Sequence, residues 1–421
     1  MKTTTFTTLF LSTALGIAGP ELTERPQPQS WIEPSINIRA RFEYGDLAAP
    51  GLERATAWTL RERIGFSTRD FNGFSALLEG EFLQYAGAYD SAPSAFTSQT
   101  TKPNPLAPRT QINDPETNEL NRAHLDYQTK NTTFRAGRQR IILDNAAFVG
   151  NVGWRQNEQT YDAFSIANAS IPDLTLFYAY ANRANRIFGS DATGALRNFA
   201  GDIHLIHGSY DGLGETKITA YSYLMDFDET AANSGYISNN TYGIIAAGPV
   251  GPLKYHAEFA YQTDTGSSPA TKPTESWYTH LNASYAYSDH TFTLGCEYLD
   301  AGFVTPLATV HAFNGYSDVF VAPRIGLVNN PGLADLYFSH STPLPIWDVK
   351  FSQAIHFFGD NNANFDYGTE YDAVLTKQFS DHFLGIAKFA LYDSKGASAG
   401  PISNIAPFDA TRFSIEMNYS F

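Results

Sequence analysis

The last eleven residues constrain the fold of this chain more than any other segment. Over residues 411–421 apolar and polar side chains alternate without interruption, and the apolar face carries Phe413, Ile415, Met417, Tyr419 and Phe421. Strict alternation over roughly 9–11 residues predicts a tilted β-strand that spans a bilayer, with lipid on one face and water on the other. The segment therefore predicts the closing strand of a membrane barrel.

Composition leaves few other fold classes. The 421 residues include 32 Gly, 24 Tyr and 31 Phe but three Met and one Cys, a balance that suits strands, turns and aromatic belts. Cys296 has no disulfide partner, and past the N-terminus no run of 18 apolar residues could form a helical membrane span. A net charge of −15 disfavours nucleic acid as a partner. A soluble all-β protein and a membrane barrel remain.

The N-terminus has the features of a secretory leader. Met1 and Lys2 precede an apolar stretch over residues 6–18, and Gly19, Pro20 and a polar segment follow. Small residues before Gly19 predict cleavage there. The sequence therefore predicts a signal peptide over residues 1–18, a short periplasmic segment over 19–34 and an outer-membrane β-barrel over 35–421.

Alternation and chain breakers divide the rest of the chain into eighteen strands. Their predicted ranges are 36–44, 57–68, 74–84, 119–128, 132–140, 160–167, 174–182, 202–210, 216–226, 240–247, 253–262, 276–287, 290–299, 333–341, 346–357, 368–378, 382–392 and 411–421. None of the 22 prolines falls inside these ranges, as expected where each backbone N–H must donate to a ladder.

Connection lengths alternate with one phase along the whole chain. Links after even-numbered strands are short, whereas links after odd-numbered strands are longer, as in barrels with short periplasmic turns and long external loops. A soluble sandwich has no reason to keep that phase. The longest predicted loops cover residues 86–118, expected to be mobile and external, and residues 300–332. The fold class is therefore an all-β transmembrane antiparallel barrel of about eighteen strands.

Arginines are concentrated in the first half of the chain. Sixteen of the eighteen precede residue 200. Alternation points several of them into the lumen, and others lie at or above the next hairpin. The predicted pore-lining set is Arg39, Arg41, Arg61, Arg63, Arg122, Arg135, Arg138, Arg140 and Arg155. Confined guanidinium groups attract anions, and their planar forks suit carboxylates. This pattern predicts a path for anionic solutes or acidic sugars.

An alternative interpretation makes the same arginines structural. The carboxylates predicted to face inward on the same wall are Glu43, Glu79, Glu81 and Asp126. They could pair with the arginines and only stiffen the wall, although both roles can coexist in a diffusion pore. Glu79 and Glu81 share one strand face and show no opposing acid of the kind a glycosidase needs.

Other candidate sites carry less weight. His204 and His207 fall on opposite faces of one strand, so they cannot share a metal ion. The Asp- and Asn-rich residues 359–366 suit a turn better than a calcium loop. Nucleophile elbows, phosphate loops, dinucleotide fingerprints and zinc signatures are missing. The expectation is no metal, no cofactor and no catalysis.

Three groups of residues carry a resemblance to a known family. Residues 137–145 (GRQRIILDN), 148–158 (FVGNVGWRQNE) and 160–163 (TYDA) resemble the alginate-export family of outer-membrane porins, as do 121–127, 313–318 with Gly326 and Leu327, and the terminal strand. The resemblance implies an eighteen-stranded monomeric barrel that passes an anionic uronate polymer through an arginine-lined pore. Ala147, where many relatives have Arg, and Tyr316, where Trp is usual, depart from the pattern.

The leading hypothesis is a passive channel in the bacterial outer membrane. Anionic small solutes or an acidic polysaccharide would diffuse past the inward arginines and the loop of residues 138–158. The expected partners are outer-membrane lipid and, through the strand ending at Phe421, the barrel assembly machinery. The alternatives are a loop-plugged barrel acting as a surface adhesin or structural protein, and a barrel enzyme such as a lipid hydrolase.

Overall fold

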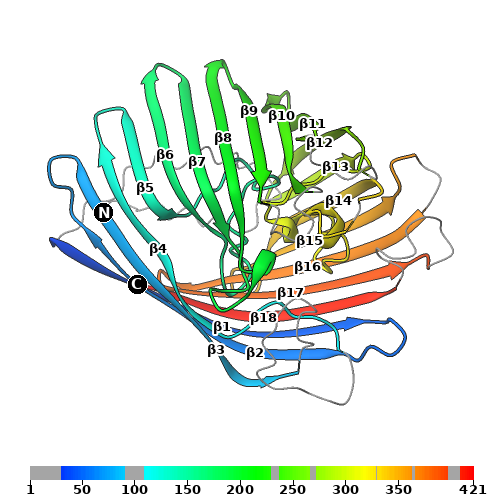
Figure 1. The fold of residues 1–421 in the computed structure, drawn as a ribbon. Helices are drawn as coiled ribbons and strands as arrows, with labels where there is room; N and C mark the ends of the chain where they lie inside the picture. Colours follow the sequence, from blue (N-terminus) through cyan, green and yellow to red (C-terminus); the bar gives the residue numbers. More distant parts are fainter. Residues whose placement is uncertain are drawn as a thin grey trace.

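One closed antiparallel sheet of eighteen strands forms the computed structural model of the chain (Figure 1). The structure describes residues 30–90, 109–228, 237–265, 272–328, 330–362, 366–396 and 408–421. Each strand pairs with its neighbours in sequence, and β1 (Ile32–Leu47) closes the ring on β18 (Ala410–Ser420), with Arg41 opposite Glu416. The predicted fold class is confirmed.

The other sixteen strands follow the chain around the ring. They are β2 (Ala55–Thr68), β3 (Phe74–Tyr89), β4 (Thr117–Gln128), β5 (Thr132–Gln139), β6 (Thr160–Ile171), β7 (Leu174–Asn185), β8 (Asn198–Leu213), β9 (Thr216–Phe227), β10 (Asn239–Val250), β11 (Leu253–Thr263), β12 (Glu275–Tyr287), β13 (His290–Leu299), β14 (Leu333–Leu344), β15 (Val349–Gly359), β16 (Asp366–Ser380) and β17 (Phe383–Ser394). The described loops add two 3-10 turns, η1 (Gly194–Leu196) and η2 (Val310–Ala312), and one short helix, α2 (Val321–Arg324).

All eighteen predicted strands are present, and most are longer than predicted. β1 begins at Ile32, so it includes the last three residues of the predicted periplasmic segment. The extensions also bring Pro34, Pro249 and Pro343 into strands, each close to a strand end. The predicted signal peptide, residues 1–18, lies outside the described residues.

Large apolar side chains cover the outside of the barrel. Leu78, Phe259 and Leu294 alternate with inward polar residues and are 44–58 % exposed. At the end with the short turns, exposed aromatic residues form a girdle that includes Trp31, Phe71, Tyr287, Trp347, Phe379 and Phe421. An apolar band bordered by aromatic rings matches a bilayer and its interface. Within the described residues, no helix has the length and apolar character needed to span a membrane.

Both ends of the barrel sheet meet at the short-turn side. The backbone groups of Ile36 and Phe421 exchange two hydrogen bonds, of 3.0 and 2.9 Å. Two-residue connections such as 288–289 lie at this end, where Ser288 adopts a positive φ of 52°. In barrels of this kind the short turns face the periplasm.

Two long loops fold into the barrel. One covers residues 140–159 between β5 and β6, and the other covers residues 300–332 between β13 and β14. They pair where Gly150 N–H donates to the Leu307 carbonyl at 2.9 Å and Thr309 N–H donates to the Ala146 carbonyl at 2.9 Å. The joined loops are called the 140–159 loop and the 300–332 loop below.

A third inward segment corrects a prediction. The sequence predicts that residues 86–118 form a mobile external loop, but β3 extends to Tyr89 and residues 109–116 lie against the inner loops. Ile112 is buried, and Asp114 is buried and accepts from Gln156 N–H at 3.0 Å. Residues 91–108 lie outside the described part of the chain.

Candidate functional site

The inward faces of β1–β5 form a wall rich in arginine, called the basic wall. It carries Arg39, Arg41, Arg61, Arg63, Arg122 and Arg135. Period-2 alternation puts them on the lumen side because their neighbours Trp58, Ile64 and Leu125 are exposed on the outside. The sequence predicted the facing of these six residues correctly.

Four of these arginines are covered by the 140–159 loop. Arg39, Arg41, Arg61 and Arg63 are at most 8 % exposed. Arg39 donates to the carbonyls of Gly153 and Arg155, each at 3.0 Å, and Arg41 donates to the carbonyl of Trp154. The guanidinium groups thus supply the donors that an irregular loop in a barrel interior needs.

Each carboxylate that the sequence predicted as a counter-charge forms an ion pair with an arginine. Glu43 contacts Arg155 at 2.9 Å and Arg412 at 3.2 Å. The remaining contacts are Glu79 with Arg122 at 2.7 Å, Glu81 with Arg63, and Asp126 with Arg135 at 2.7 Å. The structural interpretation of the arginines therefore describes most of the contacts that these residues make.

Arg61 differs from its neighbours. It is 1 % exposed and donates to the Asn37 side chain, but none of the described carboxylates lies within 4 Å of it. Its Nε has no hydrogen-bond partner among the described residues. The basic wall therefore keeps a positive charge that is not neutralised by direct pairing.

Glu158, in the 140–159 loop, joins two parts of the network. Its carboxylate lies 2.6 Å from Arg140 Nη2 and 3.5 Å from Arg63 Nη1, and Asn121 donates to it at 2.8 Å. Burial alone would raise the pKa of this carboxyl, but Arg140 and Arg63 hold it well below its ordinary value. The loop is thus fixed by a charged carboxylate.

Three arginines remain in contact with open space. The side chains of Arg122, Arg135 and Arg140 are 20 %, 24 % and 31 % exposed, whereas those of Arg41 and Arg155 are 2 % exposed. Each of the three has a carboxylate on one side and the lumen on the other. These are the predicted pore residues that a passing solute can reach.

Arg138 does not line the lumen, contrary to the prediction. It lies three residues from the inward Arg135, so alternation places it on the outer face, opposite Ala123 and Asp162. There it contacts Asp162 at 2.6 Å and the carbonyl of Leu120 at 2.9 Å. Arg140 returns to the lumen because β5 ends at Gln139 and the chain turns inward.

The inward faces of β11–β16 form a second wall, separated from the basic wall by β6–β10 on one side and by β17 and β18 on the other (Figure 1). This acidic wall carries Glu258, Glu297, Asp335, Glu370 and Asp372, each at most 3 % exposed. All of them except Glu258 accept hydrogen bonds from the 300–332 loop. Arg324 from α2 contacts Glu297 at 2.9 Å, and the N–H groups of Ser317 and Tyr316 donate to Glu370 and Asp372 at 2.7 and 3.2 Å.

The two loops meet at a stack of rings. Trp154 lies on His311 with ring centroids 3.5 Å apart, and His311 Nδ1 lies 2.9 Å from Asp318. Burial lowers the pKa of His311 to about 4, although Asp318 opposes the shift. Burial would raise the pKa of Asp318, but His311 and the guanidinium groups of Arg412 and Arg155 lower it to about 2.

Sequence reasoning missed several members of these networks. Asp114 and Glu158 lie outside strands, so alternation could not assign their facing. His256, Glu258 and His280 form a buried group whose ligand-type atoms lie within 4.8 Å of one another, although no metal site was predicted. Alternation puts His256 and Glu258 on one face, but the register of β12 against β11 is not visible in the sequence.

Two weaker candidates have structural roles in the described residues. His204 faces outward beside Tyr178, and His207 faces inward and contacts Asp144 at 3.0 Å, so the predicted opposite facing is confirmed. In the Asn-rich turn, Asn361 donates to Asp300 at 2.6 Å. Residues 363–365 of that turn lie outside the described part.

Solved structures share this fold across nearly the whole chain. OccAB2 of Acinetobacter baumannii superposes with a TM-score of 0.67 at 16 % identity, covering 92 % of this chain and 98 % of that one. OpdQ of Pseudomonas aeruginosa gives 0.67 at 12 % identity with 93 % and 98 % coverage, and the outer membrane protein opdK of the same species gives 0.64 at 13 % with 92 % and 99 %. No protein-family model and no curated relative matches the sequence.

These comparisons refine the expectations from sequence. The closed eighteen-stranded barrel with an apolar outer band is a barrel of the bacterial outer membrane. Its structural neighbours are Occ and Opd proteins, so the finer resemblance to the alginate-export family gains no support from them. At identities of 10–16 % the likeness concerns the fold.

Proposed function

We propose that the chain is a passive outer-membrane channel for small anionic solutes, including acidic saccharides. One observation carries the proposal: water reaches three arginines of the basic wall but does not reach the carboxylates of the acidic wall. The carboxylates of the acidic wall are at most 3 % exposed, whereas Arg122, Arg135 and Arg140 remain partly exposed on the basic wall. A confined channel with exposed cations concentrates anions.

Lysines near the periplasmic end extend the same charge. Lys217, Lys254 and Lys350 each lie an even number of residues from an inward side chain, namely Thr219, His256 and His356. Lys254 and Lys350 are exposed and Lys217 is half-buried. An anion that passes the exposed arginines thus meets further cations before it leaves the barrel. The mechanism needs no cofactor and no covalent step.

Ion selectivity in planar bilayers tests this function. Under a potassium chloride gradient, we expect the reversal potential to be shifted toward the equilibrium potential of chloride. Replacing Arg122, Arg135 and Arg140 together with Gln should lower the chloride-to-potassium permeability ratio several-fold, since each change removes a water-accessible charge. Replacing the outward Arg138 and Arg183 with Gln is the matched control and should leave the ratio unchanged. Cation preference in the unmodified protein would contradict the proposal.

The paired inner loops favour one alternative function. They cross from the wall of β8–β12, where Asp144 contacts His207, to the basic wall, where Gln156 donates to Thr59 Oγ1 at 2.8 Å. A barrel closed in this way could serve as a surface adhesin or a structural protein. It would give no conductance in the same bilayers, so one experiment separates the two functions.

The chain ends carry two further parts of the proposal. Residues 1–18 act as a cleaved leader, and the strand ending at Phe421 is read by the barrel assembly machinery. Removing Phe421 should reduce the amount of assembled barrel in the outer membrane without changing the selectivity of the barrels that form. Unchanged assembly would remove Phe421 from the recognition signal.

A further inference from the structure

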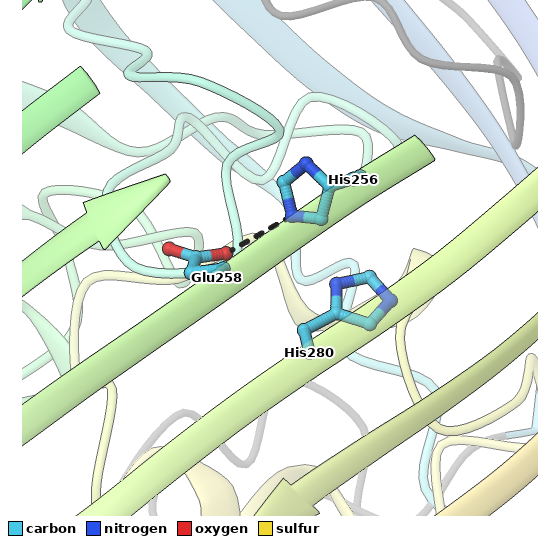
Figure 2. A group of neighbouring side chains, drawn as sticks. All are labelled: His256, Glu258 and His280. Atoms are coloured by element: carbon cyan, nitrogen blue, oxygen red, sulfur yellow. Dashed lines mark ion pairs between the residues drawn. The ribbon is translucent and has the colours of Figure 1, made fainter. Parts of the chain in front are cut away.

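Three side chains converge on the inner face of the acidic wall, below the 140–159 loop. His256 and Glu258 lie on β11 at positions i and i+2, and His280 lies on β12 directly opposite Glu258 in the strand register. Figure 2 shows the two imidazole rings and the carboxylate gathered on these neighbouring strands. All three residues are at most 6 % exposed.

The atoms that face one another have no hydrogen-bond partners among the described residues. They are His256 Nε2, Glu258 Oε2 and His280 Nδ1. His256 Nε2 and Glu258 Oε2 lie 3.5 Å apart, and each of the three residues offers one ligand-type atom within 4.8 Å of the other two. Each buried polar atom without a partner costs about 1–3 kcal/mol. Three such atoms in one place indicate a ligand that satisfies them together.

We propose that His256, Glu258 and His280 bind a divalent transition-metal ion of the zinc type, with a fourth position left for water or a solute oxygen. Two imidazole nitrogens and one carboxylate oxygen are a donor set that zinc prefers when one position stays open. Zinc bonds of about 2.0–2.2 Å at the tetrahedral angle hold ligand atoms about 3.4 Å apart. The 3.5 Å spacing of His256 Nε2 and Glu258 Oε2 already meets that value, and His280 has to move closer to complete the set.

Two tyrosine hydroxyls contact the donor side chains at the atoms that point away from the group. Tyr221 donates to Glu258 Oε1 at 2.7 Å, and the Tyr337 hydroxyl lies 2.9 Å from His280 Nε2. These contacts leave Glu258 Oε2 and His280 Nδ1 directed toward the group, as outer partners do in metal sites. Each tyrosine ring lies over a glycine, because a Cβ on Gly243 or Gly295 would overlap the ring of Tyr221 or Tyr337.

The charges around the group favour a cation. Glu258 belongs to the group, and Asp144 faces it from the 140–159 loop beside His207. Glu297 faces it from β13 but is paired with Arg324 at 2.9 Å. Tyr221, Tyr223 and Tyr278 complete the surroundings as neutral groups. An added dication would therefore lie beside the carboxylate of Glu258 and near that of Asp144.

Metal titration of the full-length barrel, refolded in detergent without a polyhistidine tag, tests the site. The protein carries His290→Gln and His340→Gln, because these two side chains lie 2.9 Å apart on the surface and could bind metal themselves. Competition with a chromogenic chelator should show one Zn²⁺ bound per chain. Co²⁺ in its place should give the strong visible absorption of a four-coordinate site.

Variants of donors and outer partners sharpen the test. Glu258→Gln and His280→Gln should weaken Zn²⁺ binding more than about 100-fold, and Tyr221→Phe and Tyr337→Phe by about 10- to 100-fold. Tyr178→Phe is the matched control, since its hydroxyl lies 2.9 Å from His204 on the lipid face, and should change nothing.

Two outcomes would overturn the proposal. They are less than stoichiometric Zn²⁺ binding in the parent protein, and unchanged affinity in Glu258→Gln. The heat-dependent electrophoretic mobility of barrels shows whether a donor variant folds. If it does not fold, the Zn²⁺ affinities of the two tyrosine variants serve as the test. Unchanged affinity in both Tyr221→Phe and Tyr337→Phe would then also count against the site.

Discussion

The basic and acidic walls hold their loops with opposite chemistry. On the basic wall, strand arginines donate to loop carbonyls, as Arg39 does to Gly153 and Arg155. On the acidic wall, strand carboxylates accept from loop N–H groups, as Glu370 does from Ser317. Both arrangements supply partners for irregular backbone that would otherwise stay unsatisfied inside the barrel.

The walls differ in what they leave exposed. The carboxylates of the acidic wall are all buried, and all except Glu258 hold the 300–332 loop. The basic wall extends beyond the 140–159 loop and leaves Arg122, Arg135 and Arg140 in contact with the lumen. The same residue types therefore serve as loop anchors where they are covered and as channel lining where they are not.

The largest expected effect is at the centre of the acidic wall. Arg324→Met leaves Glu297 buried without its cation, although Tyr278 and Asn314 still donate to it at 2.6 and 2.7 Å. Breaking a buried pair in this way typically costs about 3–5 kcal/mol. We expect that loss in urea unfolding of the refolded barrel, together with faster proteolysis within residues 305–325.

A double variant isolates the cause. Glu297→Gln combined with Arg324→Met removes both charges, so much of the lost stability should return. A loss below about 1 kcal/mol in the single variant would mean that Arg324 does not hold the loop, and the distinction between covered and exposed charges would fail on this wall.

The next largest expected effect is the pH dependence of stability at the junction of the two loops. His311 is neutral when folded because its pKa is about 4, whereas an unfolded histidine has a pKa near 6.5. The unfolded chain binds more protons, so this contribution is complete above pH 6.5 and is lost as pH falls to 4. The difference between the folded and unfolded pKa values of His311 corresponds to about 3 kcal/mol of folding free energy. Amide exchange of residues 307–318, corrected for intrinsic rates, should report it.

His311→Gln is the control for the loss of protection between pH 6.5 and 4. The variant should show little change in protection between pH 6.5 and 4. It should keep a smaller second loss below about pH 4, because the guanidinium groups of Arg412 and Arg155 still lower the pKa of Asp318 after the contribution of His311 is removed. Equal pH slopes in both proteins between 6.5 and 4 would show that His311 does not control the junction.

The sequence was sufficient for the strands because each has one lipid-facing and one water-facing side. Period-2 alternation and excluded prolines placed all eighteen, and the facing of Arg39 or Glu79 followed from the same alternation. Alternation cannot predict the facing of residues beyond the strand ends. Arg140 and Glu158 meet only because β5 stops at Gln139 and the chain folds inward.

Burial was the property that sequence could not supply. Arg63 and Arg135 look equivalent in the alternation pattern, yet one is covered by the 140–159 loop and the other is partly exposed. The difference arises from loop docking, which joins residues more than a hundred positions apart, such as Arg39 and Gly153. The register between β11 and β12 that aligns Glu258 with His280 is hidden for the same reason.

The smallest expected effect is at the exposed margin of the basic wall. Arg135→Gln removes a guanidinium that is 24 % exposed, and Asp126 keeps His124 Nδ1 at 2.9 Å. Because water can replace the lost contact, the free energy of unfolding should fall by no more than about 1 kcal/mol. Arg138→Gln, which breaks the outward pair with Asp162, offers a comparison of equal chemistry on the lipid side. A loss above about 2 kcal/mol in Arg135→Gln would make it an anchor like Arg324, and the exposed arginines would then have to be counted with the structural network instead of the channel lining.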